Sequence, residues 1–172
     1  MRKIYPLMIV LLAMLVFASS ALASTSKTFA ARLSGANEVP PRETDAFGAA
    51  FFAVNEDGSA FKYRLKVANI ENVTASHIHC AAAGVNGPVG VTLFVGSAGS
   101  GPFDGLLASG TITAPDTGNS CGWTSVADVV AAIANGGAYV NVHTNDGVAP
   151  TNTGPGDFPG GEIRGQISGF NP

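Results

Sequence analysis

Three histidines are the residues of this sequence best suited to binding a metal ion. His77 and His79 are two positions apart in a short segment that is typical of a β-strand. Side chains alternate between the two faces of a strand, so both imidazoles lie on one face and Ile78 lies on the other. Two histidines at this spacing, with a third from another strand, form a suitable set of nitrogen ligands for copper or zinc.

The third histidine, His143, belongs to a second segment that alternates in the same way. Two valines share one face of residues 139–143, whereas Asn141 and His143 share the opposite face. All the histidines therefore lie opposite the aliphatic side chains of their strands. If the two strands are neighbours, the three imidazoles converge on one site, and copper or zinc is the metal that such a site would suit.

A segment near the C-terminus adds charged side chains to this polar face. Ile163 and Ile167 are expected to point into the core, so Glu162 and Arg164 point away from it. A carboxylate can serve as a fourth metal ligand or can orient an imidazole through a hydrogen bond. The alternative is a structural polar cluster without metal, in which Glu162, Arg164 and Asn141 join the imidazoles and hold three strands in register. The sequence leaves both alternatives open.

Motifs of common enzymes are absent from the sequence. It contains no Gly-x-Ser-x-Gly motif, no phosphate-binding loop and no dinucleotide fingerprint. Ser76 directly precedes His77, so the two side chains point to opposite faces and do not form a catalytic pair. We predict a non-enzymatic binding or structural module. The second alternative is a copper- or zinc-binding protein with redox or metal-handling activity, and the third is a hydrolase or dismutase.

The elements that position these residues are mostly short β-strands. Phe61, Tyr63 and Leu65 alternate with Lys62 and Arg64, as expected for a strand with one buried and one solvated face. Gly-rich turns separate the other apolar runs. We predict an all-β fold: an antiparallel immunoglobulin-like or Greek-key β-sandwich or barrel with one short helix. The expected strands are residues 27–33, 48–55, 60–67, 75–80, 89–95, 107–113, 139–145 and 161–168, and the helix is residues 125–135.

The first residues have the pattern of a removable secretory signal. Arg2 and Lys3 precede an apolar run over residues 7–17, and the small-x-small motif Ala21-Leu22-Ala23 follows. The run is shorter than the ~20 residues needed to span a bilayer, which argues against the alternative of a membrane anchor. We expect a signal peptide over residues 1–23 and one domain over residues 24–172, which is secreted, periplasmic or at the cell surface, with no later transmembrane segment.

Charge and cysteine content agree with an exported domain. Removal of Arg2 and Lys3 from the 9 basic residues leaves 7 against 12 acidic ones, without a basic cluster, which argues against a nucleic-acid partner. We expect an extracellular or periplasmic ligand instead. Cys80 and Cys121 are the two cysteines, and in an oxidising compartment they most simply form a disulfide. The alternative is that Cys80, next to His79, is a metal ligand.

The sequence resembles the CHRD domain, the repeated unit of chordin that also occurs in single-domain secreted bacterial proteins. The resemblance implies an immunoglobulin-like β-sandwich or barrel outside the cytoplasm, and a binding or structural module whose ligand it does not name. The His-x-His strand is also similar to that of copper/zinc superoxide dismutase, but three histidines are too few for its two-metal site. The segments that match the CHRD domain are residues 33–41 (LSGANEVPP), 76–79 (SHIH), 84–89 (GVNGPV), 110–112 (GTI), 138–144 (AYVNVHT) and 160–167 (GGEIRGQI).

Overall fold

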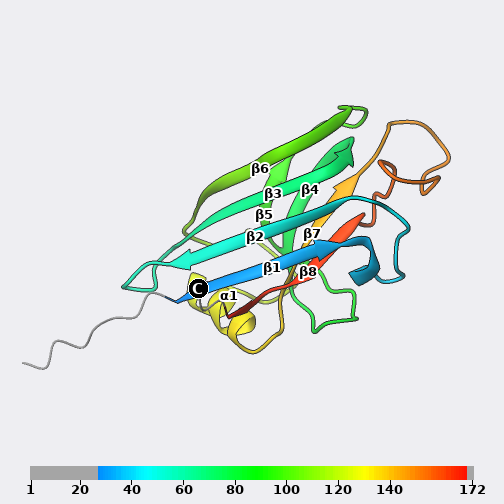
Figure 1. Cartoon of the computed structure of the whole chain (residues 1–172). Coiled ribbons are helices and arrows are strands. Elements are labelled where there is room, and N and C mark those ends of the chain that lie inside the picture. The colour runs from blue at the N-terminus through cyan, green and yellow to red at the C-terminus, as the bar shows by residue number, and fades with distance from the viewer. Residues whose placement is uncertain (1–26, 170–172) are drawn as a thin grey trace, which may run out of the picture.

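The computed structural model describes residues 27–169, so the expected signal peptide and its cleavage site lie outside the described residues. Nine strands within this range form one antiparallel sheet in the order β5-β4-β7-β8-β1-β2-β3-β6, with β9 beside β1. The two ends of this order, β5 and β6, contact each other, so the sheet forms a nearly closed barrel (Figure 1). The strands are β1 (Thr28–Ser34), β2 (Phe47–Val54), β3 (Phe61–Glu71), β4 (Val73–His79), β5 (Val89–Val95), β6 (Pro102–Ile112), β7 (Tyr139–Thr144), β8 (Ile163–Gln166) and β9 (Ser168–Gly169). The prediction of an all-β antiparallel fold is confirmed, in its barrel-like form.

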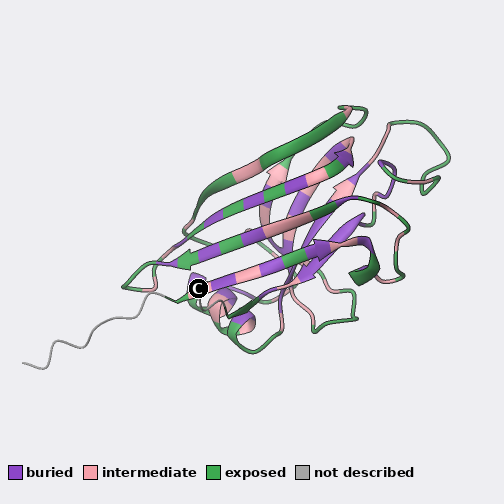
Figure 2. Ribbon diagram, viewed as in Figure 1, coloured by how far each residue is buried: buried purple, intermediate pink, exposed green. Residues whose placement is uncertain are grey.

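Alternating side chains build the interior of the barrel. On β3, Phe61, Tyr63 and Leu65 are buried while the residues between them are exposed, and Figure 2 shows this alternation along the strands. The hydroxyl of Tyr63 donates to the carbonyl of Leu93 on β5 at 2.6 Å. This hydrogen bond connects two strands that are far apart in the sheet order and helps to close the barrel.

The helix α1 (Val126–Ala134) packs its apolar side against the core near the start of β1 (Figure 1). Ser125 and Asp128 form a capping box: the Ser125 hydroxyl accepts from the backbone N–H of Asp128, and the Asp128 carboxylate accepts from that of Ser125. The helix predicted over residues 125–135 is therefore confirmed. Within residues 27–169 no helix is long and apolar enough to cross a bilayer.

The strand β6 differs from its predicted bounds. It begins at Pro102, whereas the sequence analysis starts this strand at residue 107 and places a turn before it. The extra residues pair with the far end of β3, where Ile70 lies opposite Phe103 after a break in register. Most side chains of β6 are exposed. The early part of the strand therefore lacks the apolar alternation by which a strand is recognised.

Candidate metal centre

The three histidines lie together on the outer face of the neighbouring strands β4 and β7. Across this pair of strands, His77 is opposite Asn141, and His143 is opposite Ala75. Because Ala75 precedes His77 by two residues on β4, the side chains of His77 and His143 are diagonal neighbours on the same face. One ring nitrogen from each histidine lies within 4.8 Å of the corresponding nitrogens of the other two. Ile78 points the other way and is fully buried in the core. The alternation of the two strands thus places all three imidazoles at one site.

His79 presents an unshared lone pair to this site. Its Nδ1 donates to the carbonyl oxygen of Gly87 at 2.9 Å, which places the free lone pair on Nε2. That Nε2 atom is buried and has no hydrogen-bond partner. The imidazole is stacked on the ring of Tyr139, with centroids 4.9 Å apart and an angle of 9° between the planes. Both contacts fix the direction in which Nε2 points.

His143 is oriented in the same manner by a second backbone carbonyl. Its Nδ1 donates to the Pro159 oxygen at 2.9 Å, so its Nε2 also carries a lone pair. This Nε2 lies 3.1 Å from Nδ1 of His77. Three atoms that are all within 4.8 Å of one another lie within about 2.8 Å of a common point. Metal–nitrogen bonds are about 2.0–2.1 Å, so small ring movements bring all three nitrogens to bonding distance.

Burial keeps these imidazoles neutral. Desolvation lowers the pKa of His79 and of His143 to about 4, and the nearby Arg164 guanidinium and the other histidines add to the effect. Desolvation also lowers the pKa of His77, against the opposing attraction of Asp116. At neutral pH the three imidazoles are therefore uncharged, and each keeps one nitrogen lone pair with which it can bind a metal.

A buried ion pair flanks the histidines. Arg164 on β8 contacts the Glu38 carboxylate through Nη2 at 3.0 Å and Nε at 3.1 Å, and both side chains are almost completely buried. The guanidinium lies 4.2 Å from the centroid of the Tyr139 ring, which also contacts His79. Arg164 is thus connected to the metal-binding face through Tyr139. The sequence analysis did not select Glu38, although it is the one charged residue in the segment 33–41.

Two other predicted residues occupy different places. Glu162 is fully buried, but its carboxylate accepts from the hydroxyls of Thr44 and Thr144 and from the Gly156 N–H, and none of these partners is a histidine. Asn141 does lie on the histidine face, opposite His77 on one side and Arg164 on the other. Its buried Oδ1 has no hydrogen-bond partner. Asn141 therefore belongs to the polar layer around the histidines, and Glu162 to a separate network.

Cys80 and Cys121 form a disulfide, so Cys80 is not present as a free thiolate ligand. The bond holds one end of the loop of residues 81–88, which carries the Gly87 carbonyl that orients His79. A Cβ atom on Gly87 would collide with the carbonyl oxygen of Cys80. Glycine at this position lets the loop lie close enough to the strand to reach His79.

Comparison with known proteins identifies one family. The model of the CHRD domain matches residues 29–167, which is most of the chain. The match begins and ends within the barrel, and it includes all three histidines, Glu38, Arg164 and both cysteines. No curated protein and no solved structure was found to match. The chain belongs to the CHRD domain family.

Proposed function

We propose that this chain is an exported, non-enzymatic binding module whose ligand is a copper or zinc ion held by His77, His79 and His143. The observation that carries this proposal is the buried Nε2 of His79, which has no hydrogen-bond partner although its ring belongs to the cluster of three imidazoles. An unsatisfied buried polar atom costs about 1–3 kcal/mol. A metal ion bonded to Nε2 would remove that cost.

The ligand set favours copper and zinc over harder ions. Three neutral imidazole nitrogens suit copper and zinc, whereas calcium and magnesium require oxygen ligands. Two of the imidazoles are oriented by carbonyl oxygens, those of Gly87 and Pro159, as is usual for histidines that bind metals. We expect Cu²⁺ to bind more tightly than Zn²⁺, in the general order of stability for nitrogen sites.

Export supports this assignment. We infer that residues 1–23 are removed after Ala23 and that the domain of residues 24–172 works outside the cytoplasm. The disulfide between Cys80 and Cys121 agrees with an oxidising compartment.

A metal titration of the purified chain tests the proposal. We expect Cu²⁺ and Zn²⁺ to bind in a 1:1 ratio with micromolar or tighter affinity, measured in competition with a chromophoric chelator. His79→Ala and His77→Ala are each expected to weaken binding at least about 100-fold, because each removes one of only three ligands. The chain contains no other histidine, so no second imidazole site can mask the loss.

Glu43→Gln is the matched control, because it removes an exposed carboxylate without touching the histidines. This variant should bind as tightly as the parent chain. For Cu²⁺, nitrogen hyperfine structure in the electron paramagnetic resonance spectrum should report imidazole ligands and should change in His79→Ala. Binding weaker than micromolar, or binding that His79→Ala leaves unchanged, would refute the metal site and leave the structural polar cluster as the role of these histidines.

A further inference from the structure

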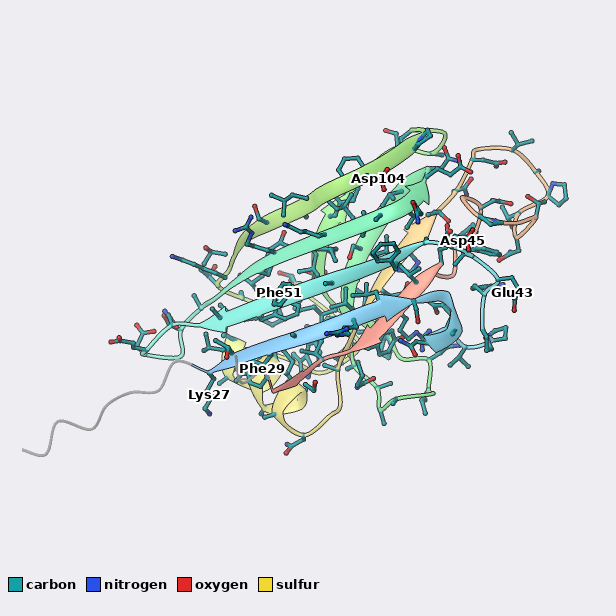
Figure 3. The ribbon with its side chains drawn as sticks, in the orientation of Figure 1. Lys27, Phe29, Glu43, Asp45, Phe51 and Asp104 are labelled. Atoms are coloured by element: carbon teal, nitrogen blue, oxygen red, sulfur yellow. A yellow bond between two sulfur atoms is a disulfide. The ribbon has the colours of Figure 1, made fainter. Side chains whose placement is uncertain are left out.

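The outer face of β1, β2 and β3 gathers half-exposed aromatic rings and basic side chains. Phe47 and Phe51 on β2 are 54% and 44% exposed, although each is a large apolar side chain. Strand register places Phe51 directly beside Arg64 on β3 (Phe51 is labelled in Figure 3). In the next row, Ala49 lies between Lys66 on β3 and Arg32 on β1. The aromatic strip thus has basic side chains on both sides.

This face is positively charged in an otherwise acidic domain. Four of the seven basic residues within residues 27–169 project from it, and all four are exposed: Arg32, Lys62, Arg64 and Lys66. The strands β1 and β2 contain no acidic residue, and β3 has only Glu71, at its far end. The charge of the face is therefore opposite to that of the chain as a whole.

A groove covers the part of this face that holds Arg32 and Lys66, whereas Lys62 and Arg64 lie outside its lining. It has a volume of about 1260 Å³, and its lining includes Arg32, Phe47, Ala49, Phe51 and Lys66. Two strand spacings separate Lys66 from Arg32, so the basic residues stand about 9.5 Å apart across a floor of alanine. Along β3, Lys62 and Lys66 are about 13 Å apart. Lys66 and Arg32 thus offer one cationic group on each side of the groove floor.

We propose that this groove binds an acidic polysaccharide, a chain of sugar acids such as a polyuronate. The apolar C–H face of a sugar would stack on Phe47, and the carboxylates would pair with Arg32 and Lys66 on either side. A membrane surface fits less well, because both rings lie on a strand within a groove and do not project from a loop. Nucleic acid fits less well, because domains that bind it are usually basic overall.

Isothermal titration of the purified chain with polygalacturonate, beside neutral dextran, tests this surface. We expect binding to polygalacturonate at low ionic strength that weakens with added salt, and no binding to dextran. Lys66→Gln should weaken binding about threefold, as expected for one exposed ion pair at the edge of the groove. Phe47→Ala should weaken it about tenfold, because a stacking ring is lost.

Lys27→Gln is the matched control, because it removes an exposed base that lies outside this groove. It should leave the affinity unchanged, as should His79→Ala, which separates this surface from the proposed metal site. Melting temperatures of all variants show that the fold is intact. The proposal is overturned if polygalacturonate does not bind, if Lys66→Gln behaves like Lys27→Gln, or if phosphatidylglycerol vesicles or oligothymidylate bind more tightly than polygalacturonate.

Discussion

Replacing Glu38 with alanine is expected to lower the free energy of unfolding by about 3–5 kcal/mol, because it leaves the buried Arg164 guanidinium without its counterion. Arg164 is only 4% exposed, and Glu38 provides its carboxylate partner. Its other contacts are neutral: the Val85 carbonyl, the Asn86 side chain and the Tyr139 ring. These neutral groups solvate the guanidinium only in part, so the unpaired charge destabilises the folded state.

Urea unfolding at pH 7 measures this loss. Glu43→Ala is the control, because Glu43 is an exposed carboxylate that is also close to the N-terminal strands. The double variant Glu38→Ala/Arg164→Met should be more stable than Glu38→Ala alone, since removal of both charges leaves no buried ion unpaired. A loss below about 1 kcal/mol for Glu38→Ala would show that solvent or another group compensates Arg164, and would contradict the structure of this pair.

The position of Glu38 shows where sequence analysis stops. Alternation within a strand is a local property, so the sequence was sufficient to place His77, His79 and His143 on polar faces and Phe61 in the core. The sequence could not predict that β4 and β7 are neighbours, because strand order depends on contacts between residues that are distant in the chain. The ion pair of Glu38 with Arg164 could not be predicted for the same reason, since the two residues are 126 positions apart in the chain.

For Glu162, local alternation predicted the wrong surroundings. Its place in the alternation is the same as that of Arg164, so the sequence assigned both to one polar face. In the structure the chain before β8 leads Glu162 to hydroxyls of Thr44 and Thr144, because β8 begins only at Ile163. Side chains alternate between the two faces only within a strand, so the rule does not apply to Glu162, which precedes the first residue of β8. The early start of β6 escaped prediction for a related reason, since a mostly exposed edge strand does not need an apolar face.

The stability of the metal-free protein is expected to fall as the pH decreases from about 6.5 towards 4. An imidazole in the unfolded chain has a pKa near 6.5, whereas burial lowers the pKa of His79 to about 4. Between these values the unfolded state binds the proton more tightly, so the free energy of unfolding decreases with falling pH. The difference corresponds to about 3 kcal/mol for His79 alone. Above pH 6.5 this contribution to the pH dependence vanishes.

The groups around His79 decide the shape of this profile. Desolvation, His77 and Arg164 all disfavour a proton on it, and the Gly87 carbonyl partly favours one. Glu38 acts in the opposite direction, because desolvation raises its pKa and its protonation stabilises the folded state as the pH falls. The slope between pH 6.5 and 4 is therefore the net result of these opposing contributions.

Urea unfolding in the presence of a chelator, repeated at several pH values in this interval, measures the slope. His79→Gln is the informative variant, because its amide can still donate towards the Gly87 carbonyl but does not titrate. Its slope should be clearly smaller than that of the parent chain, whatever its stability at pH 7. Added Zn²⁺ should stabilise the parent chain most at pH 7 and progressively less towards pH 4, because protons and metal compete for the same lone pairs. An equal slope in His79→Gln would mean that His79 accepts a proton without cost, which its buried Nε2 does not allow.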